Sequence, residues 1–239
     1  KGLLPYLIDA ENAPEDAPVT TVDATAAEIN AAADGDTEYR LTGYITSIVK
    51  EDYGNLYIKD ATGEVYVYGT LDAEGKAQNF GSLGIKAGDI VTVVGPKTSY
   101  KEAPQMKNVM VEKHYAVTDK TSKEFLAASD NKEVYYRLSG TVANLKDGDL
   151  YGNFDLQDAD GSVYVYGLLA GWGGEKKKFQ ELGIKNGDSQ VCIYGTRSHR
   201  GFSSTSDLEF QDALAAQSPR SFHLLAGDKS KYSEYIICI

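Results

Sequence analysis

The sequence lacks any hydrophobic stretch long enough to cross a bilayer. No run of 18 or more apolar residues occurs among the 239, and the segment after Lys1 has neither the basic start nor the apolar centre of a signal peptide. We therefore expect no membrane span in this chain. A signal or a lipidated cysteine upstream of Lys1 would leave no mark on these residues.

Cysteine and histidine are scarce. Cys192 and Cys238 are too few for a disulfide framework and are not spaced as metal ligands. We expect a buried thiol at Cys192 and a second thiol near the terminus, with a single bridge between the two as the alternative. His114, His199 and His223 lie far apart in the sequence, without metal-binding spacing. The sequence predicts no metal and no cofactor.

Motifs for catalysis are also missing. The chain has no Gly-x-Ser-x-Gly, phosphate loop or dinucleotide fingerprint. The segment 158–161 (Asp-Ala-Asp-Gly) starts like a calcium loop, but it has no closing glutamate, and Thr62 replaces Asp160 in the matching segment 60–63. A hairpin turn explains it better. We expect a non-catalytic protein. The alternative is a hydrolase whose site is built from distant carboxylates.

The net charge of −11 is unevenly distributed. Residues 1–38 hold one base and nine acids, whereas residues 39–116 hold nine of each sign. Residues 117–239 hold 14 bases and 17 acids. The acidity therefore belongs mainly to the start of the chain and says little about the surfaces of the folded parts.

An internal repeat divides the chain into two similar parts. Tyr-Arg-Leu-Thr-Gly at 39–43 recurs as Tyr-Arg-Leu-Ser-Gly at 136–140, and Tyr-Val-Tyr-Gly at 66–69 recurs at 164–167. Two further blocks recur in the same order, Tyr-Gly-Asn (53–55 and 151–153) and Leu-Gly-Ile-Lys (83–86 and 182–185). We expect an acidic, proline-containing leader or linker (1–22), two domains (23–116 and 117–216) and a C-terminal tail (217–239).

Each copy begins with a helix-start pattern. Thr25 with Glu28, and Thr121 with Glu124, fit the capping box, in which both side chains satisfy free backbone amides. The pattern predicts short helices over about 25–33 and 121–129.

The remaining pattern of the first copy is mostly β. Alternation and turn residues predict strands over about 39–50, 55–60, 64–69, 90–95 and 105–113, with a short helical segment around Phe80 to Ile85. Gly43 can bend the long first strand. Three strands, a helix and two strands are the order of a five-stranded OB barrel. We predict an all-β protein with short helices, made of two tandem OB-fold barrels; an SH3-like barrel or a sandwich is the alternative.

Each predicted barrel has its own core. The alternation places one apolar set inside the first barrel, and the repeat places a matching set inside the second. The two sets are Leu41, Ile58, Val67, Leu83 and Val93, and Leu138, Leu156, Val165, Leu182 and Ile193.

The first copy resembles known OB-fold families. Gly43-x-Ile45, followed by the strand–turn–strand segment 56–67, is similar to OB domains of the anticodon-binding and replication-protein type. With the Tyr-Val-Tyr-Gly and Leu-Gly-Ile-Lys-x-Gly-Asp segments, the chain looks more like the tandem OB domains of secreted or surface-anchored Bacteroidetes proteins. The resemblance implies a binding protein that is exported, in the periplasm or at the cell surface, with a lipid anchor upstream of Lys1 as one form.

The second copy departs from this pattern toward its end. A polar segment, 189–194, stands where the first copy has an apolar strand, and the tail from Gln217 has no counterpart. Its last residues, 235–239, can form an edge strand or pack across the end of the barrel.

The resemblance places the binding face on the outer side of the second and third strands and the adjoining loops. Alternation points Leu56, Ile58, Val65 and Val67 inward and the tyrosines between them outward. The predicted ligand-binding residues are aromatic or basic: Tyr53, Tyr57, Lys59, Tyr66, Tyr68, Lys97, Tyr100, Lys101, Tyr151, Tyr164, Tyr166, Trp172, Arg197 and Arg200. Lys107 flanks the same face. Packing against a helix or the other barrel is the alternative role for the tyrosines.

These observations predict a tandem binding or assembly module. Its ligand is a polymer, either single-stranded nucleic acid or glycan, or it is a protein partner in a surface complex. Barrels close to neutral disfavour tight non-specific binding of nucleic acid, because that binding depends on neutralising phosphates. The sequence does not fix the oligomeric state.

Overall fold

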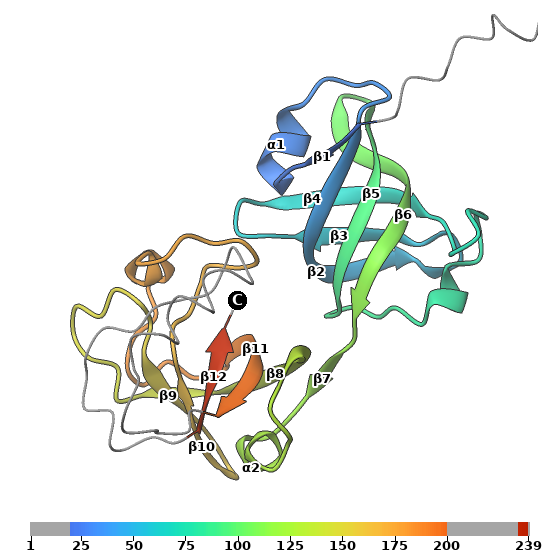
Figure 1. The fold of residues 1–239 in the computed structure, drawn as a ribbon. Coiled ribbons are helices and arrows are strands. Elements are labelled where there is room, and N and C mark those ends of the chain that lie inside the picture. The colour runs from blue at the N-terminus through green and yellow to red at the C-terminus, as the bar shows by residue number, and fades with distance from the viewer. Residues whose placement is uncertain (1–19, 200–233, 239) are drawn as a thin grey trace, which may run out of the picture.

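The computed structural model describes residues 20–199 and 234–238, which form two β-barrels of one topology (Figure 1). Each sheet has five barrel strands and one further short strand that pairs with the first of them. Counting the five barrel strands alone, the third pairs with the fifth, the fifth with the fourth, and the fourth with the first. A short helix connects the third and fourth strands. This is the OB fold, and the predicted fold class is confirmed.

The first barrel follows the predicted order of elements. In chain order these are β1 (Thr21–Asp23), α1 (Ala26–Ala31), β2 (Glu38–Lys50), the 3-10 helix η2 (Glu51–Tyr53), β3 (Asn55–Lys59), β4 (Glu64–Thr70), the 3-10 helix η3 (Phe80–Leu83), β5 (Ile90–Tyr100) and β6 (Ala103–Tyr115).

The second barrel repeats this order. Its elements are β7 (Val117–Asp119), α2 (Ser122–Leu126), β8 (Asn131–Ala143), β9 (Phe154–Asp158), β10 (Gly161–Val165), the 3-10 helix η4 (Phe179–Leu182), β11 (Val191–His199) and β12 (Glu234–Cys238).

Strand β2 bends so that its first half pairs with β5 and its second half with β3. Gly43 lies where the pairing changes, and a Cβ there would stand 2.4 Å from the carbonyl oxygen of Lys59. Gly140 holds the same place in β8, with a Cβ 2.4 Å from the carbonyl oxygen of Gln157. Since only glycine allows the backbones to approach this closely, the repeated glycine is required for the bend.

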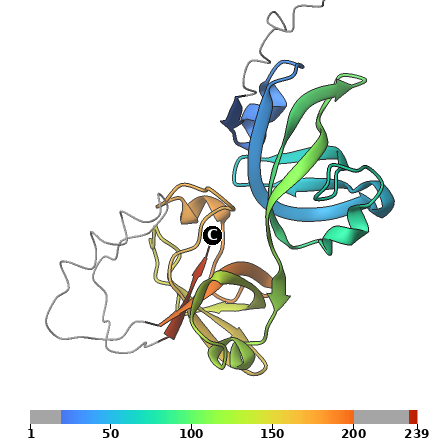
Figure 2. The ribbon, with the colours of Figure 1, turned by 45° about the vertical axis from the view of Figure 1, so that its right-hand side comes forward.

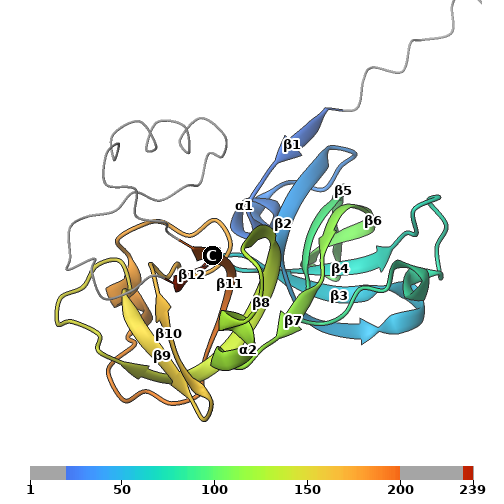
Figure 3. The same ribbon diagram turned by 60° about the horizontal axis from the view of Figure 1, so that its bottom comes forward.

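Strand β12 comes from the tail that the sequence left unassigned. It runs parallel to β10 and antiparallel to β11, where β6 lies in the first barrel (Figure 3). It therefore has a partner on both sides, and the expected edge strand or packing across the barrel end is wrong for residues 234–238.

The start of the chain also differs from the prediction. Residues 1–19 of the predicted leader lie outside the described residues. Thr21 and Val22 form β1 with Asp23 and pair in parallel with β2. The last residues of the predicted leader therefore belong to the first barrel.

The two cores are separate, as predicted. Leu41, Ile58, Val67 and Val93 are buried in one cluster, and Leu83 packs against it. The second cluster buries Leu138, Leu156, Val165 and Ile193, and Leu182 packs against that one. The repeated alternation therefore gives each copy its own core.

The helices confirm both capping boxes, and both helices end earlier than predicted. The Asp-x-x-Gly turn holds each helix in place: an Asp60 carboxylate oxygen accepts from the amide of Ala26 at 2.8 Å, and Asp158 accepts from Ser122 at 2.7 Å. Asp60 also accepts from the amide of Gly63 within its own hairpin. The hairpin-turn interpretation of these motifs is confirmed.

Two pairs of tyrosine rings join the barrels. Tyr44 of β2 stacks on Tyr194 of β11 with ring centroids 5.4 Å apart, and Tyr115 meets Tyr135 edge to face at 5.3 Å. Burial, followed by the neighbouring Tyr194, raises the pKa of Tyr44 above its ordinary value. Both ring contacts run from the first barrel to the second, and the two barrels lie side by side (Figure 2).

Cys192 differs from its prediction. It is a free, exposed thiol on β11, next to the buried Ile193. Alternation along the strand turns the thiol outward, so neither the expected burial nor the alternative disulfide describes it.

Candidate tyrosine groove

A groove of about 360 Å³ opens on the first barrel, on the face predicted to bind a ligand. Three of its lining residues are predicted site tyrosines, Tyr57 of β3, Tyr66 of β4 and Tyr100 of β5. The rest of the lining, which the sequence did not single out, is Asn30, Glu64, Ala103, Pro104 and Gln105. We call this site the tyrosine groove.

The β3–β4 ladder forms the floor of the groove. Tyr57 and Tyr66 are direct cross-strand partners, and their ring centroids lie 5.0 Å apart. The residues before and after them are buried in the core, which confirms the predicted alternation. Burial raises the pKa of Tyr66 above its ordinary value, so its hydroxyl is neutral at physiological pH. The floor is thus an uncharged aromatic surface.

The β5–β6 hairpin forms one wall of the groove. Tyr100 is 64% exposed and pairs with Ala103 across a two-residue turn. The turn residues Lys101 and Glu102 have positive φ angles of 47° and 69°. Residues other than glycine and asparagine rarely adopt this backbone conformation. The Lys101 amine lies 5.3 Å from the centre of the Tyr100 ring. The turn therefore carries an exposed aromatic ring at its edge.

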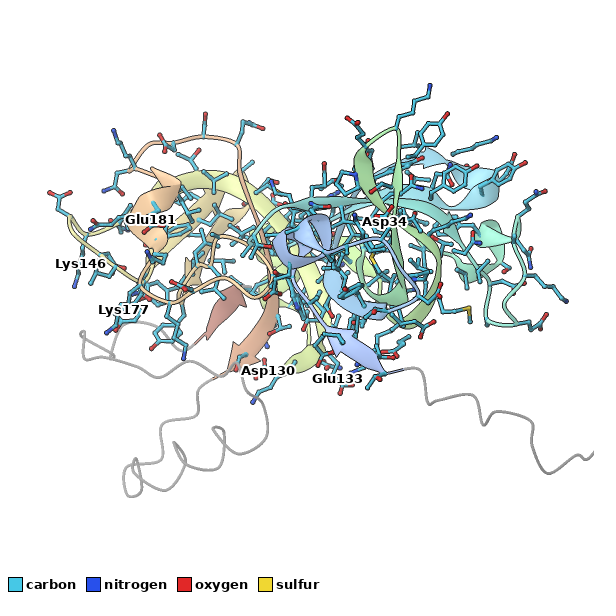
Figure 4. The ribbon with its side chains drawn as sticks, turned by 90° about the horizontal axis from the view of Figure 1, so that it is seen from above. Asp34, Asp130, Glu133, Lys146, Lys177 and Glu181 are labelled. Atoms are coloured by element: carbon cyan, nitrogen blue, oxygen red, sulfur yellow. The ribbon has the colours of Figure 1, made fainter. Side chains whose placement is uncertain are left out.

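An ion pair between a buried lysine and a half-exposed aspartate holds this hairpin against the segment after α1. Lys97 donates to Asp34 at 2.6 Å and to Ser99 at 3.1 Å, and only 7% of its side chain is exposed (Figure 4 labels Asp34). The hydrogen bond from Lys97, and then that from Ser99, lowers the pKa of Asp34. Lys97 was predicted to contact ligand. The structure corrects this prediction, because the side chain of Lys97 is buried and its amine forms an ion pair with Asp34.

The second barrel repeats this arrangement. Arg197, also buried, pairs with Asp130 and donates to the backbone oxygen of Leu126 at 3.0 Å (Figure 4 labels Asp130). Lys97 and Arg197 occupy the same place in the two copies, each binding the aspartate that follows the first helix. The predicted ligand contact of Arg197 is corrected for the same reason. Arg200 lies outside the described residues.

Three further predicted residues of the first barrel lie outside the lining of the groove. Tyr68, on β4, is 48% exposed and is paired in register with Lys107 of β6. Lys59 is exposed at the end of β3. Tyr53 is half-buried, with the Lys50 amine 4.1 Å from its ring centre. Tyr68 and Lys59 lie on β4 and β3, which contribute other residues to the lining, whereas Tyr53 lies on η2, which contributes none.

The predicted residues of the second barrel are not gathered in one described site. Tyr164 and Tyr166 are half-buried, and Tyr151 has the Lys177 amine 5.8 Å from its ring centre. A polar hollow of about 510 Å³ on this barrel, at the ends of β8 and β9, is lined by none of them.

Trp172 belongs to the contact between the barrels. Its backbone oxygen accepts from the amide of Ala61 at 3.0 Å, and its ring centre lies 6.1 Å from that of Tyr135. A packing role therefore accounts for its position.

The polar groups of the groove are carboxamides and one acid. Asn30 donates to the backbone oxygen of Glu64 at 2.9 Å, and Gln105 donates to Thr98 at 3.3 Å. The Glu64 carboxylate accepts from the hydroxyl of Thr46. No basic side chain is among the lining residues of this groove.

Within residues 20–199 and 234–238 the protein shows neither a metal centre nor a membrane helix. They contain no group of three His, Cys, Asp or Glu placed to hold a metal. None of the helices in the described ranges is long and apolar enough to span a membrane.

Comparison with known proteins gives distant structural likenesses. No family model matches the chain, and no curated protein matches it. A solved structure of the hypothetical protein ygiW from E. coli is 22% identical, with a TM-score of 0.28, over 41% of this chain and 90% of its own. A chain of the S. pombe Stn1-ten1 complex is 18% identical, with a TM-score of 0.25, over 32% of this chain and 55% of its own. The OB assignment rests on the strand order given above.

Proposed function

We propose that the chain is a non-catalytic tandem OB-fold module that binds a ligand in the tyrosine groove of its first barrel. One observation carries the proposal: Tyr57, Tyr66 and Tyr100, which come from three different strands, line one open groove. The groove lies over the second and third barrel strands and beside the loop between the fourth and fifth. Oligonucleotides and oligosaccharides bind OB folds on this face.

The geometry suits a ligand built of ring-shaped units, either flat bases or puckered sugars. Exposed tyrosine faces bind such units by stacking and dispersion, and their hydroxyls add hydrogen bonds. The ion pair between Lys97 and Asp34 holds the hairpin wall, so little ordering accompanies binding. Single-stranded nucleic acid and glycan are the polymers that fit, and a protein partner is the third class.

Heteronuclear NMR of the full chain tests the site itself. The chain is titrated in parallel with an oligothymidylate and with a pool of neutral oligosaccharides. We expect amide shifts confined to Tyr57, Tyr66 and residues 100–105 with at least one of the two, and the Tyr66→Ala variant should lose them. Val49→Ala is the control, because Val49 is 59% exposed on β2 and is not among the lining residues.

Two results would overturn the proposal. One is the absence of shifts at the groove with both ligands. The other is a set of shifts that map elsewhere and survive Tyr66→Ala.

We also propose that the module acts at the cell surface, as its resemblance to exported tandem OB proteins implies. Antibody labelling of intact cells tests this, since a protein inside the cell would be labelled only after permeabilisation.

A further inference from the structure

We infer that the ligand of the tyrosine groove is a neutral glycan. The inference rests on the proposed function and narrows it to one chemical class. Three features of the lining carry it: three tyrosine rings, two carboxamides, and an acid as the only charged side chain.

The three rings give a sugar aromatic surface on which to pack. Tyr57 and Tyr66 lie together on the floor, while Tyr100 stands on the hairpin wall, and all three line the same space. A pyranose has apolar C–H faces that pack on such rings, burying apolar area without desolvating a charge. A groove of about 360 Å³ is at the lower end of the range of small-molecule sites, which suits one or two sugar units of a longer chain.

The polar groups match hydroxyls. Asn30 and Gln105 each use one amide N–H within the protein, to Glu64 and Thr98. The side-chain oxygen of each amide and its second N–H remain available to a ligand. Amides both donate and accept, as sugar hydroxyls do, and the Glu64 carboxylate adds acceptors. The groove thus offers both kinds of partner that a hydroxyl group needs.

The charge disfavours a phosphate backbone. Glu64 is the only side chain in the lining that is charged at neutral pH, and a phosphate in the groove would lie near its carboxylate. Lys59, Lys101 and Lys107 are exposed nearby but do not line the groove. Affinity for a nucleic acid comes largely from cations that neutralise its phosphates, and the groove presents none.

A glycan array, followed by calorimetry, tests the class. The full chain should bind neutral glycans on the array, and the affinity should be about equal at low and high salt, because no counterions are released. Tyr66→Ala and Tyr100→Ala should each weaken binding about tenfold. Val49→Ala should leave it unchanged, and circular dichroism checks the fold of each variant.

Glu64→Gln separates the two polymers. The substitution removes the one full negative charge of the lining, so binding of a neutral glycan should stay independent of salt. Binding of a polyanion should strengthen, because a negative charge has been removed. Binding of oligothymidylate at the groove, lost in Tyr66→Ala and steeply weakened by salt, would overturn the glycan inference and leave the proposed function standing. Absence of binding to every neutral glycan on the array would also overturn it. A groove that shows no NMR shift with either ligand class would overturn both.

Discussion

Replacing Ile58 by alanine tests whether the two barrels are independent folding units. Ile58 is completely buried in the first core, and its Cγ2 lies where a Cβ on Gly43 would approach within 2.9 Å. The change removes three carbons, or about 2.4 kcal/mol of transfer free energy at about 0.8 kcal/mol for each. A tight barrel collapses incompletely around the cavity, which raises the expected loss to about 3–4 kcal/mol.

Urea unfolding, together with hydrogen exchange read by mass spectrometry, measures this loss. Peptides from β2 to β6 should lose protection, whereas peptides from β8 to β11 should keep it. The exposed Val49→Ala should change the free energy of unfolding by less than about 0.5 kcal/mol. Equal loss of protection in both barrels would refute the separate cores, and a cost below about 1 kcal/mol would refute the packing argument.

Three further predictions concern the bend, the contact between the barrels and the response to acid. Gly43→Ala should destabilise the first barrel by about 1–3 kcal/mol, measured by urea unfolding, because its Cβ would stand 2.4 Å from a carbonyl oxygen; a neutral result would show that β2 shifts freely. Tyr44→Ala removes the ring stacked on Tyr194 and should loosen the pair of barrels, seen as a larger radius of gyration in small-angle scattering; an unchanged radius would mean that the other contacts suffice. The pKa of Asp72 is lowered, first by the hydrogen bond from Asn79 and then by that from the amide of Lys76. Its contribution to stability is therefore present above the unfolded pKa of about 3.9 and is lost as pH falls through the folded-state value. Unfolding at pH 7 and pH 3 should show a smaller acid effect in Asp72→Asn than in the parent, and equal effects would contradict the assignment.

The outward tyrosines show how far the sequence leads toward the site. Alternation alone predicted that Tyr57 and Tyr66 face outward, because side chains on a strand change face at every residue. It could not show that Asn30 and Gln105 join them. These two come from α1 and from β6, far apart in the chain, and nothing in their own segments marks them.

The sequence by itself determined the division into two similar copies, the strand order of the first barrel, the capping boxes and both cores, because each follows from short-range patterns. Only the tertiary structure showed the features that depend on contacts between residues far apart in the chain. Strand β12 closes the second barrel across a long intervening segment. Lys97 and Arg197, which resemble ligand-binding cations in the sequence, are buried because aspartates remote in the chain neutralise them. Trp172 packs against Tyr135 and Ala61 because the barrels lie side by side. A local pattern fixes which way a side chain points, but only the folded chain fixes what it meets.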